Sequence, residues 1–373
     1  MTRAPRTIDR PFLLTTLALL LLGVFIFSSA SLGLLTRSGA SFSSLAISQF
    51  LFGVGGGIVV LTILANVRYR YLKRIAPHLF GVALLLTALV FVPGLGYEAN
   101  GARRWLEILN VSFQPAELLK VSFILVLAWF YSTHHRKIND IRYALGGLLG
   151  ALLCTALVLL PQPDTGTFAI LALTGGVMAL AAGIRWHHVF TIVGVGLIAL
   201  SILAFARPYL LDRVTTFLDP LSDPRGSGYQ IKQSLIAVGS GGVFGRGYGQ
   251  SVQKFNYLPE PVGDSIFSVA AEEFGFVGSV TILGLFVLFA FRGLLIASRA
   301  TDRFGGLVAV GLVILIVIQS FINISSMVGL MPLTGEPLVF ISQGGTSLLF
   351  ALASAGIILN ISRYQRPRVL QTV

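Results

Sequence analysis

The chain has 373 residues, of which 55% are hydrophobic and only 11% are charged. Because a soluble domain carries about 25% charged residues, this composition excludes an ordinary soluble protein and predicts an integral membrane protein. The net charge of +12 does not indicate nucleic-acid binding, since the sequence has no soluble basic domain, no basic–aromatic strand pattern and no zinc-finger spacing.

Apolar runs follow one another along the chain, and a window of about 20 residues per membrane-crossing helix predicts about ten of them. Their expected limits are 11–32, 46–66, 77–93, 114–132, 142–160, 167–184, 187–206, 266–291, 305–329 and 337–361. The first run lacks a small-residue cleavage site followed by a polar mature chain, so we expect a retained helix rather than a signal peptide. The predicted fold class is all-α: one polytopic membrane domain covering residues 1–373.

Lysine and arginine are distributed unevenly between the two sides of these predicted spans. Most of the 27 lie in the terminal tails and in alternate short loops, such as residues 68–74, 136–142 and 292–303. Because positively charged short loops stay on the cytoplasmic side, both termini are expected in the cytoplasm. The polar stretch at about 207–265, between the seventh and eighth spans, is then expected to be a large extracytoplasmic loop.

This loop is longer than an ordinary connection, which favours a functional role. Its glycine-dense run, Gly239–Gly249, would let backbone N–H groups approach an anion, and Arg246 and Lys254 could complete a phosphate site. The spacing is not that of a P-loop. Asp264 lies where the loop returns to the membrane, so it either caps the next helix or acts as a carboxylate base.

Four further residues on the expected outer side are candidates for binding or structure. Arg104 precedes a tryptophan, a pair that is equally common at membrane interfaces. Glu117 and Lys120 share one helix face and could simply neutralise each other, but ionisable residues inside a span usually mark a site, which favours function. Asp164 lies in a Pro-Gln-Pro-Asp-Thr-Gly turn, where it either accepts backbone hydrogen bonds or contacts substrate.

The sequence also excludes several kinds of chemistry on the outer side. All five histidines map to the expected cytoplasmic side, and no metal-ligand spacing or Gly-x-Ser-x-Gly motif occurs on the other side. Carboxylate chemistry on an anionic substrate is what remains.

Taken together and in this order, these motifs resemble the FtsW/RodA family of bacterial cell-wall polymerases, the SEDS proteins. The segments that carry the resemblance are Asn100–Trp105, Gln114–Lys120, Gln162–Thr167, Gly228–Ile231, Gly239–Gln250, Lys254–Phe267, Glu272–Gly278, Gly329–Gly335 and Ile341–Ser347. Gln114–Glu117 and Ser251–Pro261 look more like FtsW than RodA.

The resemblance implies a ten-span peptidoglycan glycosyltransferase in the bacterial cytoplasmic membrane. It would polymerise lipid II into glycan strands at the outer face, for cell division or elongation. Its implied partners are a class B penicillin-binding protein that cross-links the strands and other divisome or elongasome membrane proteins. The family's essential aspartate maps onto Asp264, which would be the general base of an inverting transfer. The resemblance assigns no cofactor, and a divalent cation, Mg²⁺ or Mn²⁺, is left open.

The resemblance also implies roles for the other candidates. The basic groups of Arg104, Lys120, Arg246 and Lys254 would stabilise the charge that develops on the pyrophosphate. Glu117 and Lys120 would line the central cavity, with Asp164 near its outer mouth.

Some positions depart from the family pattern. The His-Thr-Asp-Phe run of the family reads Val262-Gly-Asp-Ser265 here, and Gln343 stands in place of a tyrosine. Glu336 and Val339 interrupt a segment that is otherwise apolar. The proposed base is retained, whereas its neighbours differ.

Two functions of other classes stay open from the residues alone. A lipid flippase or other transporter would explain Glu117 and Lys120 within a span. A non-catalytic scaffold would recruit a transpeptidase through its bundle surface and outer loop, and would tolerate replacement of Asp264.

Overall fold

The computed structural model describes residues 7–36, 46–99, 102–108, 111–138, 140–185, 208–219 and 226–365, with six isolated positions between 188 and 223. The α-helices are α1 (Arg10–Ser31), α3 (Gly57–Asn66), α4 (Arg70–Ala88), α5 (Pro115–Thr133), α6 (Ile141–Leu159), α7 (Thr165–Ala181), α9 (Pro208–Leu218), α10 (Ser227–Ser240), α11 (Ile266–Ser298), α12 (Arg303–Met327) and α13 (Gly345–Ser362). Shorter 3-10 and π-helical segments adjoin three of them: Leu32–Thr36, Ile47–Gly56 and Leu89–Phe91.

Eight helices in the described part of the chain are long and apolar enough to cross a membrane, which confirms a multi-pass membrane protein. Helix α7 is apolar but has only 17 residues. The predicted limits of the first six spans agree with α1, the segment 47–66, α4, α5, α6 and α7 to within a few residues, except that α4 begins earlier. The predicted span 187–206 lies almost entirely outside the described residues.

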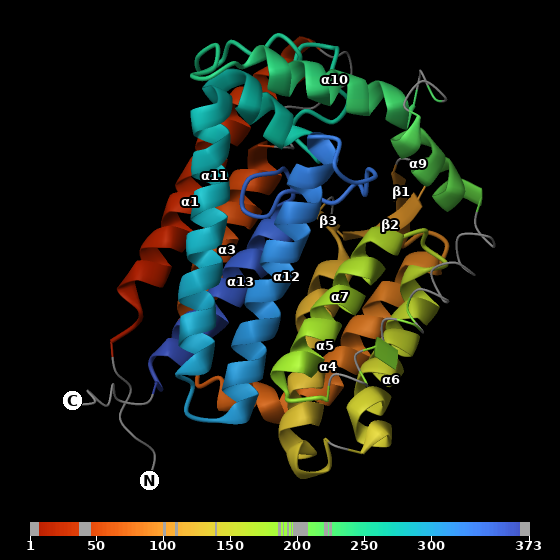
Figure 1. Cartoon of the computed structure of the whole chain (residues 1–373), viewed down its shortest axis with the longest axis vertical. Coiled ribbons are helices and arrows are strands. Elements are labelled where there is room, and N and C mark those ends of the chain that lie inside the picture. The colour runs from red at the N-terminus through yellow and green to blue at the C-terminus, as the bar shows by residue number, and fades with distance from the viewer. Residues whose placement is uncertain are drawn as a thin grey trace.

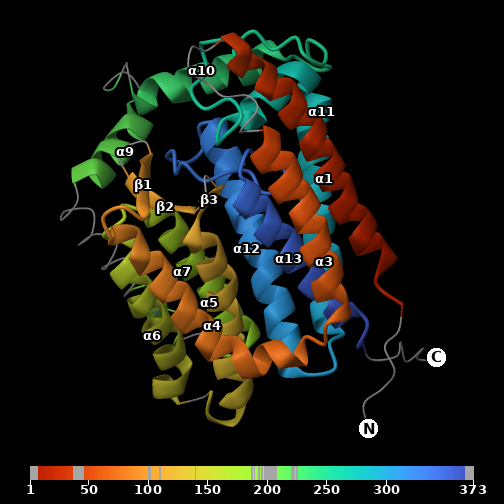
Figure 2. The same cartoon turned by 180° about the vertical axis from the view of Figure 1, so that it is seen from behind.

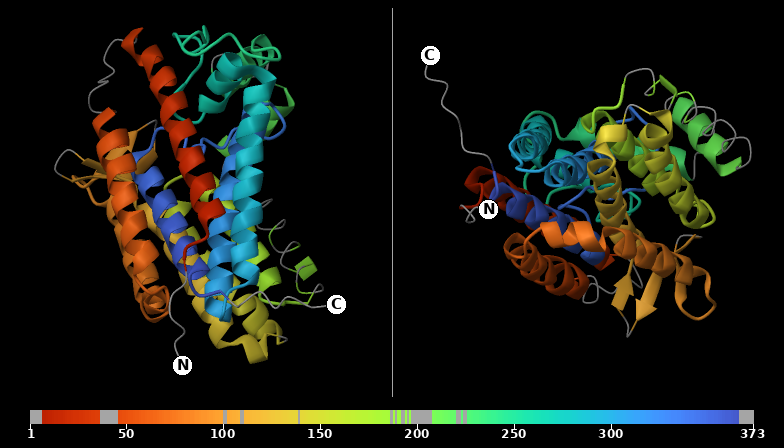
Figure 3. Two further views of the ribbon diagram at one scale, coloured as in Figure 1. Left: turned by 90° about the vertical axis from the view of Figure 1, so that its left-hand side faces the viewer. Right: turned by 90° about the horizontal axis from the view of Figure 1, so that it is seen from below.

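The helices form two groups that meet along α12. One group contains α1, α3, α11, α12 and α13, and the other contains α4, α5, α6 and α7 (Figure 1). Helix α12 packs against both α5 and α7, so the junction of these three helices joins the two groups. Seen from below, α13 lies between α12 and α3 (Figure 3). Polar residues at this junction are therefore buried inside the protein rather than in lipid.

Close packing between α3 and α13 depends on small residues. A Cβ atom on Gly356 would lie 2.6 Å from the carbonyl oxygen of Leu61, and one on Gly57 would lie 2.4 Å from the side chain of Leu352. Lipid gives helices no hydrophobic reason to associate, so such backbone approach supplies the van der Waals contact instead.

The two ends of the bundle differ in structure. Helices α9 and α10 and the loop that follows them cover one end, which we call the loop end, whereas α1 begins and α13 ends at the opposite end (Figures 1 and 2). There the backbone N–H of Asp9 donates to Ser362, and Arg292 forms an ion pair with the Asp9 carboxylate at 2.8 Å. The first and last helices are thus fastened together.

The structure corrects the sequence prediction in two connecting segments. The predicted all-α class is confirmed for the membrane bundle, but a small three-stranded antiparallel sheet that was not predicted, β1 (Gly96–Ala99), β2 (Ala102–Ile108) and β3 (Val111–Phe113), follows the third span. The predicted tenth span, 337–361, begins instead at Gly345, because the positive φ angles of Phe340 and Gly344 interrupt any helix before it.

Helix α11 is broken near its start. Gly275 has φ 66° and ψ −160°, which separates a short buried segment, Ile266–Phe274, from the long remainder of the helix. Only glycine adopts this conformation readily, and a Cβ there would also lie 2.3 Å from the backbone nitrogen of Gly245. The short segment therefore belongs to the loop end and positions what precedes it, including Asp264.

Candidate active site at the loop end

The backbone at Asp264 is held by two other parts of the chain. Asn323 of α12 donates its side-chain N–H to the carbonyl oxygen of Asp264 at 2.7 Å. The segment before α13 holds the two preceding residues: Ser342 donates to the carbonyl oxygen of Gly263, and the backbone N–H of Gln343 donates to that of Val262, both at 2.7 Å. Residues far apart in sequence thus fix where this carboxyl lies.

The Asp264 carboxyl is half-buried, and both side-chain hydrogen bonds that it accepts go to the same oxygen, Oδ1. Gln230 of α10 donates to Oδ1 at 3.1 Å, and Ser265 donates to the same atom at 3.3 Å. Burial raises the pKa of Asp264 to about 6, helped by the negative charge of Glu260 and opposed by the hydrogen bond from Gln230. This carboxyl is ionised at neutral pH and binds a proton more readily than an exposed aspartate does, as a general base requires.

A buried group of charges lies at the junction of α5, α7 and α12. The Lys120 ammonium is 2.9 Å from the Glu117 carboxylate and donates to the Gln319 amide oxygen at 2.9 Å. Glu117 and Lys120 are only 5% and 3% exposed. The expected pairing on one helix face is confirmed, and Gln319 of α12 completes it.

Glu336 joins this group, although the sequence marked it only as a departure from a family pattern. It is 6% exposed, and its carboxylate accepts from the Thr167 hydroxyl at 3.0 Å. Its backbone oxygen accepts from Asn323, the same amide that holds Asp264. One Asn323 side chain therefore connects the buried charges to the proposed base.

Burial, together with the negative charges of Asp164 and Glu117, raises the pKa of Glu336 to about 7 even though Lys120 opposes the shift. A raised carboxyl pKa favours the protonated form in the folded protein, so stability is lost as pH rises from about 4.5 to about 7. Glutamine does not titrate, so Glu336→Gln should not lose this stability. We expect the free energy of unfolding of the variant, relative to that of the unchanged chain, to be about 1–3 kcal/mol more favourable at pH 8 than at pH 5. Thermal unfolding curves at both values measure this, and an equal difference at both would contradict it.

Arg104 and Asp164 connect strand β2 to the start of α7. Asp164 is 2% exposed and caps α7, accepting from the backbone N–H of Thr167 at 3.5 Å. The Arg104 guanidinium lies 3.8 Å from that carboxylate and donates to the backbone oxygens of Gln162 and Pro163. Sequence reasoning left open a turn or a substrate role for Asp164, and the observed contacts are those of a turn. Arg104 is a quarter exposed, so one edge of its side chain can still meet a ligand.

The space beside the buried charges is small. A cavity of about 20 Å³, lined by Glu117, Lys120, Gln319 and by apolar residues and two serines from α5, α12, α13 and the segment before α13, has room for about one water molecule. Within the described residues, no three His, Cys, Asp or Glu side chains converge as metal ligands. Because Glu117 and Asp164 are paired with cationic side chains, they do not fit a divalent cation.

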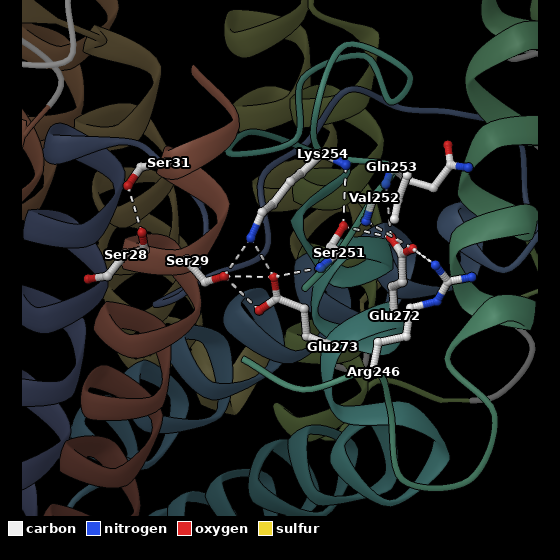
Figure 4. A network of polar contacts seen from close by, with 10 residues as sticks. All are labelled: Ser28, Ser29, Ser31, Arg246, Ser251, Val252, Gln253, Lys254, Glu272 and Glu273. Carbon is white, nitrogen blue, oxygen red and sulfur yellow. Dashed lines mark hydrogen bonds and ion pairs between the residues drawn. The ribbon is translucent and has the colours of Figure 1, made fainter. Parts of the chain in front are cut away.

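Lys254 lies in a different and fully enclosed environment (Figure 4). Its side chain is 0% exposed, and its ammonium is 2.7 Å from the Glu273 carboxylate and 2.9 Å from the Ser29 hydroxyl of α1. Ser29 also donates to Glu273. In this arrangement the hydrogen-bond partners of the ammonium are all internal, so the contact of Lys254 with pyrophosphate stays a prediction. Lys254 joins the loop to α1 and α11.

Glu272 anchors the same loop from its other side (Figure 4). Its carboxylate accepts from the Ser251 hydroxyl at 2.6 Å and from the backbone N–H groups of Val252 and Gln253. The Arg246 guanidinium lies 3.5 Å away and its side chain is 42% exposed. Arg246 is therefore the candidate cation in the loop that a ligand can reach.

Comparison with known proteins places the chain in a family. The model of a cell cycle protein family, FtsW/RodA/SpoVE, matches residues 10–367. The chain belongs to the FtsW/RodA/SpoVE family. The stage V sporulation protein E of Bacillus subtilis is 40% identical over 98% of this chain and 100% of its own length. A probable peptidoglycan glycosyltransferase FtsW of a Geobacter species is 39% identical over 83% of the chain and 84% of its own length.

Solved structures of similar proteins have the same fold. RodA of Thermus thermophilus is 28% identical, with a TM-score of 0.69 over 96% of this chain and 98% of its own. A chain from a peptidoglycan synthase complex, solved to explain how polymerization and crosslinking are coordinated, is 30% identical, with a TM-score of 0.78 over 96% of this chain and 99% of its own.

Sequence reasoning missed three polar residues of this site: Gln230, Asn323 and Glu336. Gln230 stood within the family segment Gly228–Ile231, and Glu336 was noted as an unexpected acid, so both carried a signal. Asn323 gave only one signal: an amide within an apolar run is costly to bury unless it is hydrogen-bonded, so it usually indicates a buried partner.

Proposed function

We propose that the chain is a peptidoglycan glycosyltransferase that polymerises lipid II. The observation that carries this proposal is the Asp264 carboxyl, which is half-buried, fixed through its backbone by α12, and raised in pKa to about 6. A carboxylate of that kind is suited to accept a proton near neutral pH. The glycosyltransferase names of relatives similar over most of the chain support the same reaction.

In the proposed reaction Asp264 removes the proton from the 4-hydroxyl of the acceptor sugar. The oxygen attacks the anomeric carbon of the donor and forms the new glycosidic bond. The bond from that carbon to the pyrophosphate oxygen breaks, and undecaprenyl pyrophosphate leaves with its electron pair. Attack from the face opposite the leaving group inverts the α linkage to β.

Charge on the leaving pyrophosphate requires exposed cationic groups. Arg246 and the open edge of Arg104 meet this requirement better than Lys120 and Lys254, whose ammonium groups are already enclosed with carboxylates. In this proposal the buried ion pairs of Lys120 and Lys254 stabilise the structure of the site.

The loop end faces outward across the bacterial cytoplasmic membrane, both termini are cytoplasmic, and residues 1–373 act as one membrane domain. A class B penicillin-binding protein cross-links the product, alongside other divisome or elongasome membrane proteins. The synthase complex among the solved relatives supports such a partner.

The test is to purify the full chain with its cross-linking partner, supply lipid II, and separate glycan products by length. Glycan polymer supports the proposal. Movement of lipid II across vesicles without polymer would contradict it and favour a transporter, while neither activity, with partner binding intact, would favour a scaffold.

A further inference from the structure

Gln230 of α10 forms a hydrogen bond to the Asp264 carboxyl. Its amide nitrogen donates to Asp264 Oδ1 at 3.1 Å and to the Ser265 hydroxyl at 3.0 Å. Ser265 in turn donates to the same Oδ1 at 3.3 Å. The three groups form a closed triangle, and each hydrogen of the Gln230 amide has an acceptor.

The orientation of this amide follows from its neighbour. An ionised carboxylate has no hydrogen to donate, so the nitrogen of Gln230, not its oxygen, must face Asp264. An amide also has no proton that titrates in this range, so Gln230 does not compete for the proton that the base accepts. It can favour the ionised form and fix the direction of the carboxyl without entering the chemistry.

Helix α10 holds Gln230 firmly. Ser234, one turn further on, is 0% exposed and donates to the sulfur of Met327 on α12. At the end of the helix, a Cβ on Gly241 would lie 2.1 Å from the carbonyl oxygen of Ala271 on α11. The helix is thus packed tightly on both α11 and α12.

We propose that Gln230 is a positioning residue for Asp264: its amide holds Oδ1, so that Oδ2 is the oxygen directed to the acceptor hydroxyl. This inference rests on the proposed function, because it assigns the geometry of the same base. It makes α10, which lies outside the membrane-crossing helices, a part of the catalytic machinery.

Among the groups around Asp264, the Gln230 amide is the main neutral donor to its carboxyl. Glu260, on the segment of Asp264 itself, supplies the nearby negative charge. Helix α12 supplies Asn323, which is neutral and bonds the backbone oxygen. The segment before α13 supplies the neutral Ser342, through the Gly263 carbonyl, and Glu336, whose backbone oxygen shares Asn323.

The test compares the pH dependence of lipid II polymerisation in three proteins: the unchanged chain, Gln230→Leu and Gln233→Leu. Gln233 lies three residues further along α10 and is partly exposed, so its variant is a matched control. Loss of a donor to the ionised form raises the pKa of the base. We expect the acid limb of kcat/KM to move up by about one pH unit in Gln230→Leu, so that kcat/KM at pH 6 is about fivefold below that of the control.

Above pH 8 the deficit of Gln230→Leu should shrink, since the base is then ionised in every protein. An acid limb in the same place as that of the unchanged chain, whether rates are normal or uniformly low, would overturn the proposal, because a merely structural role lowers the rate at all pH values alike. Absence of polymer from the unchanged chain defeats the proposed function itself. Asp264→Asn is measured in parallel: if it retains activity, Asp264 is not the base and the role of Gln230 falls with it, whereas its inactivity with an unmoved limb in Gln230→Leu overturns the role of Gln230 alone.

Discussion

Replacing Asp264 with asparagine is expected to lower the rate of lipid II polymerisation by about 10²–10⁴-fold at pH 7.5. The amide has the size of the carboxyl, and its oxygen can still accept from Gln230 and Ser265, so the fold should be retained. What it cannot do is take a proton from the acceptor hydroxyl. Initial rates on purified protein measure the effect, and thermal unfolding checks that the variant is folded.

Glu260→Gln is the matched control for this variant. It removes a carboxylate close to Asp264 while leaving the base itself intact. Because the charge of Glu260 raises the pKa of Asp264, the control should remain active, and its acid limb should move to slightly lower pH. An Asp264→Asn protein as active as the control would contradict the assignment of the base.

Replacing Lys254 with methionine is expected to destabilise the protein by about 3–5 kcal/mol. Both side chains of the Lys254–Glu273 pair are 0% exposed, so the variant leaves a carboxylate buried without its counter-charge. Adding Glu273→Gln to the same chain should recover part of the loss. Denaturant or thermal unfolding in detergent measures the three proteins side by side.

Arg246→Gln is the appropriate comparison, since it also breaks an ion pair of the same loop. That guanidinium is 42% exposed, and solvent screens such pairs, so a loss of only about 0–1 kcal/mol is expected. If Lys254→Met is as stable as the unchanged chain and fails only in polymerisation, the ammonium meets a ligand, as the sequence first suggested.

The membrane-crossing elements could be predicted because hydropathy is a local property. The limits of α5 and α6 follow directly from runs of about 20 apolar residues. The same rule failed for residues 337–344, where Leu338, Val339 and Phe340 are apolar but lie in an irregular buried segment. It also missed the strands at 96–113, whose short alternation lies between two long helices.

The candidate site could be predicted only where its chemistry is local. Asp264 lies just before a predicted span, and Glu117 and Lys120 are one helical turn apart, so both features can be recognised in the sequence. The contact of Gln230 with Asp264 joins residues 34 apart, and the pair of Asn323 with Asp264 joins residues 59 apart. Lys254 showed the limit most clearly, because a lysine that binds phosphate and one that closes a buried ion pair look alike until the fold brings in Glu273.

The contacts of α1 have a consequence for how the protein is made. Ser29 meets Lys254, which lies 225 residues later, and Asp9 meets Arg292 and Ser362. A ribosome delivers α1 to the membrane first and its partners in the last third of translation. The contacts that fasten α1 to the rest of the bundle therefore form only after most of the chain has been made, so the first helix enters the membrane long before it is docked.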